Sequence, residues 1–222
     1  MHGLFRLMLD RTIREIKKYS NKNIKIAFDE WNTYVEATPP YFIENYNIAD
    51  AIYAASLLNA CINRGDIITN TGIYHLINVM GNYRIEKKKI WKTPTTLVLE
   101  LYTKFHKGKI LKSVVNSSNF VSFKLGKQPE YKNNKLIDSA VTMNGKYMCM
   151  SVVNKSSSEK ILLKVPYLKR IAENYCIEGS NKVDLNTYAN TSKVKIKKNS
   201  LKTSKGFLIL PPHSISVVLF NI

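Results

Sequence analysis

The residues with the clearest chemical potential are two neighbouring carboxylates that end an apolar run. The segment IKIAFDEWN carries Ile24, Ile26 and Phe28 and then Asp29 and Glu30. The run is typical of a buried strand, which we expect over residues 24–29. A carboxylate at the end of such a strand must be hydrogen-bonded or functional, because an unpaired buried charge is costly. Asp29 and Glu30 are therefore candidates for a reactive group, although spacing alone favours an ordinary strand-end carboxylate.

The elements around this strand alternate between helix and strand. Apolar residues at helical spacing predict helices over residues 3–19, 43–64 and from Pro94 to about 107. Gly65 stands where a helix C-cap glycine belongs, and Pro94 is a favoured first-turn residue. A short second strand is expected over residues 66–70. This order predicts a parallel α/β unit over residues 1–107.

The apolar period changes to two from Lys109 onward. Short strands bounded by turn residues favour an antiparallel β-sandwich or jelly roll over residues 108–222. Asn144-Gly145 is a strong hairpin signal between two of these strands. The expected strands are KILKSVV, FVSFKL, LIDSAVTM, KYMCMSVVN, KILLKV, SKVKIKK, FLILP and SISVVLF.

Composition narrows the class of protein. The chain has 222 residues, 45% of them hydrophobic, which is enough for a sizeable core. The net charge is +18, but 28 of the 34 basic residues are Lys and 6 are Arg. Base and phosphate recognition favours Arg, so we expect no nucleic acid partner. No apolar run reaches the roughly 20 residues of a membrane span, and no secretory signal is evident, so we expect no membrane association.

The cysteines and histidines are scattered along the sequence. Cys61, Cys149 and Cys176 are odd in number and far apart, which favours reduced thiols and a cytoplasmic setting. The four histidines show no metal-ligand spacing either. We therefore expect neither a metal nor another cofactor.

Five segments together resemble one enzyme family. IKIAFDEWN, YNIADAIYAASLLNACINRGDI, TGIYHLINVMG, KTPTTLVLELYTKF and LPPHSISVVLF are similar, in this order, to the C-terminal part of α-L-arabinofuranosidases of glycoside hydrolase family 51. The resemblance implies the last strands and helices of a (β/α)8 TIM barrel over residues 1–107, followed by the β-sandwich over residues 108–222. A full barrel takes about 250 residues, so residues 1–107 would supply about two βα units.

The resemblance also implies a site. Glu30 would be the nucleophile of a retaining glycosidase, and a second carboxylate about 5–5.5 Å away would protonate the leaving oxygen. Because side chains alternate along a strand, Asp29 would point to the opposite face from Glu30 and cannot be this second carboxylate. Asp29 is expected to be a supporting hydrogen-bond partner. Trp31, Asn32, Tyr34 and His75 are candidate substrate-binding residues. Core packing is the alternative for Trp31 and Tyr34, a loop cap for Asn32, and a structural or surface role for His75. His75 also departs from the family, in which many members have Gln at this place.

The family function is release of terminal α-L-arabinofuranosyl residues from arabinan or arabinoxylan oligosaccharides. The family's acid/base Glu follows an Asn on an earlier strand, and no Asn-Glu pair precedes Glu30 here. We therefore expect the chain alone to be inactive, and to need an upstream fragment of the same enzyme or a homo-oligomer. The alternative is a non-catalytic carbohydrate-binding or partner-binding β-sandwich module. A cluster of exposed aromatic rings would favour that module, and the candidates are Tyr131, Tyr147, Tyr167, Tyr175 and Tyr188.

Overall fold

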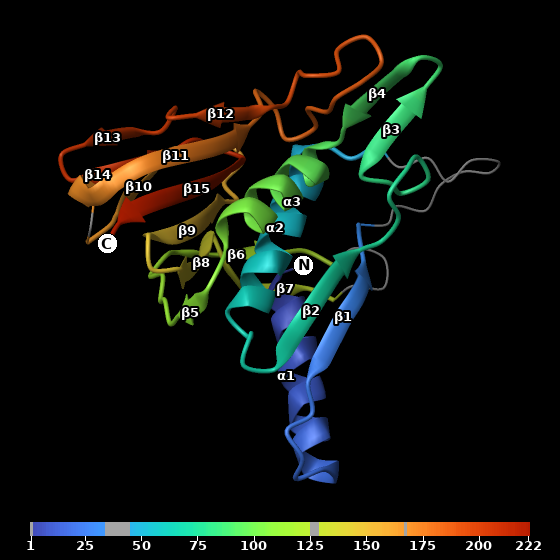
Figure 1. Ribbon diagram of the computed structural model, residues 1–222, viewed down its shortest axis with the longest axis vertical. Coiled ribbons are helices and arrows are strands. Elements are labelled where there is room, and N and C mark those ends of the chain that lie inside the picture. Colours follow the sequence, from blue (N-terminus) through green and yellow to red (C-terminus); the bar gives the residue numbers. More distant parts are fainter. Residues whose placement is uncertain (1, 34–44, 125–128, 167) are drawn as a thin grey trace.

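Helices, a parallel strand pair and antiparallel sheets make up the chain (Figure 1). The computed structural model describes residues 2–33, 45–124, 129–166 and 168–222. Within these ranges the chain is mostly strand, with three α-helices and 15 strands. None of the described helices is long and apolar enough to cross a membrane.

The first half alternates helix and strand before a hairpin. Its elements are α1 (His2–Tyr19), β1 (Ile26–Trp31), α2 (Ile48–Ile62), β2 (Ile68–Ile73), β3 (Tyr83–Glu86), β4 (Lys89–Lys92) and α3 (Pro94–Phe105). β1 and β2 pair in parallel, which confirms the predicted α/β order, although each strand starts two residues later than predicted. The hairpin of β3 and β4 was not predicted, because its turn at Lys87 has none of the usual turn residues although its φ is +52°.

The predicted bounds of α2 were too wide. Residues 45–47 are not helical, and Asn47 closes a capping box with Asp50, so the helix begins at Ile48. The helix ends with Asn63 as its C-cap rather than at Gly65. Thr93 caps α3 directly before Pro94, which confirms the predicted start of that helix.

The second half is antiparallel. Its strands are β5 (Lys109–Leu111), β6 (Asn119–Ser122), β7 (Tyr131–Lys135), β8 (Ile137–Met143), β9 (Tyr147–Asn154), β10 (Ile161–Lys164), β11 (Ile171–Glu178), β12 (Ile196–Lys198), β13 (Lys202–Ser204), β14 (Phe207–Leu210) and β15 (Ser214–Asn221). β12-β11-β15-β9-β8-β5 form one sheet, β10-β14-β13 a second, and β6-β7 a third. The predicted Asn144-Gly145 turn joins β8 and β9, with Gly145 at φ +87°. β7, β11 and β13 were not predicted.

The six-stranded sheet buries apolar side chains on both faces. On one face Val152, Cys176 and Val218 form a cluster with Leu208 and Leu210 of the three-stranded sheet. On the other face Val153, Ile177 and Val217 are joined to the buried residues of α2 and α3. The two helices therefore lie between this sheet and the β1–β2 pair, as Figure 1 shows.

α1 buries a narrow face. Leu9 and Ile13 are buried, whereas the apolar residues Leu7 and Met8 are 50% and 67% exposed. Phe5 packs against Phe28 of β1, with ring centroids 5.2 Å apart. The buried face therefore follows residues spaced by four, which lie one above another on a helix.

Candidate functional site

Glu30 lies near the C-terminal end of β1, where its side chain is exposed. Asp29 beside it is exposed as well. The pairing with β2 is irregular between Phe28 and Trp31, since these two residues pair with Thr71 and Ile73. Three residue steps on β1 therefore match two on β2, so strict alternation does not govern Asp29 and Glu30. The predicted opposite orientation of these two carboxylates does not follow from the strand period.

The expected burial of β1 was wrong over most of its length. Ala27 is exposed, and Ile26 and Phe28 are only half-buried. Ile24, just before the strand, is 41% exposed. The reason is that α1 and the core cover only the face of β1 that carries Ile26 and Phe28, so Ala27 on the other face lies open.

Trp31 ends the strand inside the core. Its side chain is 5% exposed, and its indole Nε1 donates to Thr71 Oγ1 at 2.6 Å. This is the core-packing alternative for Trp31, with its polar atom satisfied by the neighbouring strand. Contact between Trp31 and a sugar stays a prediction.

Asn32 connects three stretches of backbone. Its Nδ2 donates to Met80 O at 2.9 Å and to Tyr74 O at 3.3 Å, and its Oδ1 accepts from Thr33 N at 2.9 Å. The hydroxyl of Tyr46 also donates to Met80 O at 3.2 Å. The side chain of Asn32 therefore fixes the segment after β1 to the loop after β2. Tyr46 was not identified from the sequence, where it stands outside any periodic pattern.

His75 follows β2 by two residues and is exposed. Its ring stacks on Tyr74 at 3.8 Å, and its Nδ1 lies 2.8 Å from Val79 O. The backbone φ of His75 is +58°, which is uncommon for a residue other than glycine. Tyr34, the remaining predicted site residue, lies outside the described residues.

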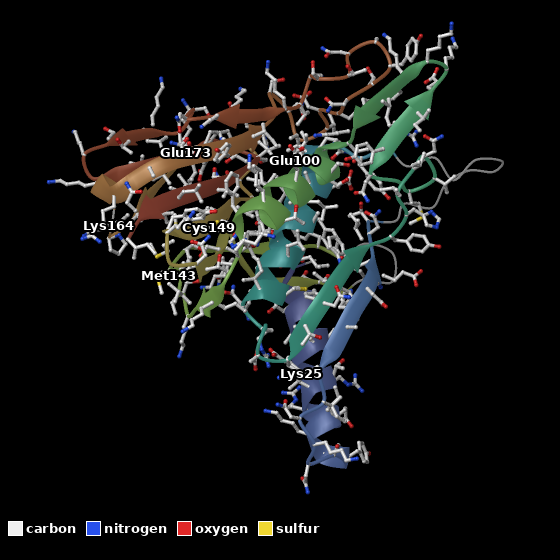
Figure 2. The ribbon with its side chains drawn as sticks, viewed as in Figure 1. Lys25, Glu100, Met143, Cys149, Lys164 and Glu173 are labelled. Carbon is white, nitrogen blue, oxygen red and sulfur yellow. The ribbon has the colours of Figure 1, made fainter. Side chains whose placement is uncertain are left out.

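The parallel pairing brings Glu30, Asn32 and His75 to one end of the β1–β2 pair. Carboxyl ends of parallel strands lie at the same sheet edge, and the contact between Asn32 and Tyr74 O joins the two segments. The opposite end is held differently: Lys25, labelled in Figure 2, donates from Nζ to Asp66 O at 2.6 Å. A carboxylate, an amide and an imidazole at one edge can attack or hydrogen-bond a polyhydroxylated ligand.

The remaining candidate groups are the cysteine thiols and the possible metal ligands. The three cysteines are free and buried, and burial raises the pKa of the thiols to about 11 for Cys61 and about 12 for Cys149 and Cys176. Such thiols are poor nucleophiles at neutral pH. Over the described ranges, no three His, Cys, Asp or Glu side chains group as metal ligands would.

The tyrosines proposed for a binding face are spread over several elements. Tyr175 packs on Phe105 of α3, with centroids 4.6 Å apart, and Tyr188 lies edge-on to Trp91 of β4 at 6.3 Å. Tyr131 and Tyr147 are half-buried on β7 and β9, which belong to different sheets. Tyr167 lies outside the described residues.

Comparisons by sequence and by structure both find α-L-arabinofuranosidases. The sequence profile of the α-L-arabinofuranosidase C-terminal domain matches residues 29–214. The intracellular exo-α-(1→5)-L-arabinofuranosidase of Streptomyces lividans is 25% identical over 193 residues, which cover 79% of this chain and 28% of that protein. The family 51 α-L-arabinofuranosidase of Thermotoga petrophila RKU-1 has a similar fold, with a TM-score of 0.83, 23% identity, and coverage of 98% of this chain and 49% of that one. The Thermotoga maritima α-L-arabinofuranosidase, solved as an arabinose complex, gives a TM-score of 0.84, 23% identity, and coverage of 99% and 48%.

The matched profile and the mostly β fold define the class as the C-terminal part of a glycoside hydrolase. The chain spans about half the length of these solved relatives and 28% of the curated one. It belongs to the α-L-arabinofuranosidase C-terminal domain family, and corresponds to the C-terminal part of a family 51 α-L-arabinofuranosidase.

Proposed function

We propose that this chain is the C-terminal portion of a retaining α-L-arabinofuranosidase in which Glu30 is the nucleophile. The observation that carries the proposal is the exposed Glu30 at the carboxyl end of a parallel strand, inside the segment that matches the family. Catalytic residues of (β/α)8 barrels lie at this end of the strands. In this proposal residues 1–107 are the last two βα units of such a barrel and residues 108–222 are a jelly-roll-like β-sandwich.

The open face of β1 supports an incomplete barrel. In a closed barrel, side chains on both faces of each strand are covered, by the packed interior and by the outer helices. Here Ala27, which points away from the half-buried Ile26 and Phe28, is exposed, so this face of the strand lacks such cover within the described residues. Further polypeptide that completes the barrel would bury Ala27.

The reaction needs a second carboxylate. Glu30 would attack the anomeric carbon, and an acid about 5–5.5 Å away would protonate the leaving oxygen. The carboxylates that precede β1 are Asp10 and Glu15 on α1, and Asp10 is bound to Arg64 at 2.6 Å. We therefore assign the acid/base to polypeptide outside this chain, either an upstream fragment of the same enzyme or a second copy of the chain. General acid help is worth about 10²–10⁴-fold, so the chain alone should be inactive or nearly so.

The substrate class follows from the relatives. The Streptomyces lividans protein is named an exo-α-(1→5)-L-arabinofuranosidase, and the Thermotoga maritima enzyme was solved with arabinose. The proposed substrates are terminal α-L-arabinofuranosyl residues of arabinan or arabinoxylan oligosaccharides, with Asn32 and His75 beside the sugar. A cytoplasmic location is supported by the intracellular relative and by three free thiols.

The test uses an arabinofuranoside substrate. The chain is assayed alone and after co-expression with the N-terminal half of the Thermotoga maritima enzyme. We expect turnover only in the combined sample. Glu30→Gly should lower turnover in that sample by more than about 10³-fold, as for loss of a covalent nucleophile. Added azide should restore turnover and give an arabinosyl azide of inverted configuration, because azide attacks from the face that Glu30 occupied.

The matched control is Glu15→Gln, an exposed carboxylate on α1. This variant should keep the turnover of the unchanged combined sample. Full turnover by the chain alone would overturn the need for a second segment. Unchanged turnover of Glu30→Gly would overturn the assignment of the nucleophile.

A further inference from the structure

A pocket separate from the residues around Glu30 lies at one edge of the antiparallel sheets. β12 and β13 follow each other in the chain but belong to different sheets, so the chain crosses from one sheet to the other between them. A pocket of about 690 Å³ opens at this crossing, and Lys197 of β12, Lys202 of β13 and Ile209 of β14 contribute to its wall. It involves none of the residues proposed for catalysis.

The charge of this pocket is unbalanced. Four lysines line it, and only two carboxylates do. The lysines are Lys160, Lys193, Lys197 and Lys202. They come from separate parts of the chain, before β10, before β12, on β12 and on β13. A net positive charge in a concave site raises the local concentration of anions.

Two of the lysines are held by the two carboxylates. Lys193 Nζ lies 2.7 Å from Asp184 Oδ1, and Lys197 Nζ lies 2.6 Å from Glu178 Oε1. Asp184 is itself fixed, since its Oδ2 accepts from Ser180 N at 2.7 Å and Ser180 Oγ at 2.8 Å. Lys193, and then the bonds from Ser180, lower the pKa of Asp184 to about 2, so the carboxylate stays charged.

The other two lysines have no such partner. Lys160 and Lys202 form no ion pair with any residue that the structure describes, and both are exposed. Ammonium groups without a protein counterion, next to a pocket whose carboxylates are already engaged, favour an external anion.

The rest of the wall indicates which anion fits. Pro211, Pro212 and Ile209 give an apolar surface, and Ser180 and Ser200 lie beside it. Neither Arg nor an aromatic side chain lines the pocket. Binding of nucleic acid relies on aromatic stacking and on Arg forks, so this wall disfavours it. Apolar C–H surface next to hydroxyl groups and cations suits a sugar ring that carries a negative charge.

We propose that this pocket binds an anionic saccharide, with its sugar ring against Pro211 and Pro212 and its carboxylate or phosphate facing Lys160 and Lys202. The site is independent of Glu30, and would let the protein hold an acidic glycan chain whether or not the barrel is complete.

The test measures binding by the 222-residue chain with titration calorimetry at low and high salt. Four probes separate the sources of charge: oligogalacturonate, arabinose 5-phosphate, neutral arabinotriose and poly(dT). The test variant is Lys160→Glu with Lys202→Glu. The control is Lys109→Glu with Lys146→Glu, which makes the same change in net charge near β5, at the opposite edge of the six-stranded sheet from β12. Thermal unfolding checks that each variant is folded.

We expect oligogalacturonate or the sugar phosphate to bind, with an affinity that falls as salt is added. Neutral arabinotriose should give no binding heat from this pocket beyond that of a buffer titration. The test variant should lose about tenfold or more in affinity, since two attractions become repulsions, while the control changes less than about twofold. Three results would overturn the proposal: no binding of either anionic sugar, equal losses in test and control variants, or tighter binding of poly(dT) that the test variant abolishes.

Discussion

Asn59 joins the helices to the sheet, and its replacement by Ala should strongly destabilise the fold. This buried side chain of α2 donates from Nδ2 to Asp138 Oδ1 of β8 at 2.6 Å. Its Oδ1 accepts from the hydroxyl of Tyr102 of α3 at 2.8 Å and from Ser151 Oγ of β9 at 2.5 Å. One amide therefore links four elements, and its loss removes a partner from three buried polar groups.

The size of the effect follows from these three bonds. A hydrogen bond to a charged group contributes about 1.5–3 kcal/mol and a neutral one about 1 kcal/mol. Tyr102 keeps a weaker acceptor in Ala55 O at 3.3 Å, and Ser151 keeps Ala140 O at 3.4 Å. We therefore expect Asn59→Ala to lower the free energy of unfolding by about 3–5 kcal/mol. That is a large part of the about 5–15 kcal/mol typical of a folded protein.

The assay is equilibrium unfolding in urea, monitored by circular dichroism. The matched control is Asn63→Ala, since Asn63 follows one turn later and makes one side-chain bond, to Ser139 O at 2.8 Å. We expect this control to cost about 1 kcal/mol. If Asn59→Ala costs no more than Asn63→Ala, the linking role of Asn59 is refuted.

Two further predictions concern buried polar groups. Burial lowers the pKa of His106 to about 4, so the unfolded chain binds its proton first as the pH falls. The stability that His106 contributes is complete above about pH 6.5 and should fall by about 2 kcal/mol between pH 7 and pH 5. His106→Asn should remove this part of the pH dependence of urea unfolding, and an unchanged profile would contradict the reasoning. Ser56 Oγ is buried without a partner among the described residues, so Ser56→Ala should raise the unfolding midpoint or leave it unchanged. Ser151→Ala should lower the midpoint, because that hydroxyl is bonded, and equal losses in the two serine variants would contradict the distinction.

The helices and strands that were predicted from the sequence are those determined by residues close together in the chain. α1 and α3 have apolar residues at helical spacing, and the β8–β9 hairpin has the Asn144-Gly145 turn. β11 was missed because Glu173 and Asn174 interrupt its apolar pattern. Asn174 is nevertheless buried, and its Oδ1 accepts from Leu201 N at 2.9 Å. Asn174 therefore finds its hydrogen-bond partner 27 residues later in the chain, and the sequence pattern around Asn174 does not indicate that partner.

In the candidate site, too, features set by neighbouring residues were predictable and features set by distant residues were not. The position of Glu30 near a strand end was predictable, because an apolar run stops there. The irregular pairing after Phe28 was not, since it depends on how β1 matches β2. The burial of Trp31 likewise depends on Thr71, which stands 40 residues away in the sequence.

The contacts of α2 indicate what the antiparallel half does for the candidate site. Asn59 fixes α2 to β8 and β9, while Cys61, two residues further along α2, is buried in the same cluster as Trp31 and Ile68. Thr71 of β2 holds the indole of Trp31, the residue after Glu30. A continuous series of buried contacts therefore runs from the six-stranded sheet to the strand that bears the proposed nucleophile. Because retaining chemistry depends on carboxylate spacing, this support would hold Glu30 in place while the other half of the site is supplied by further polypeptide.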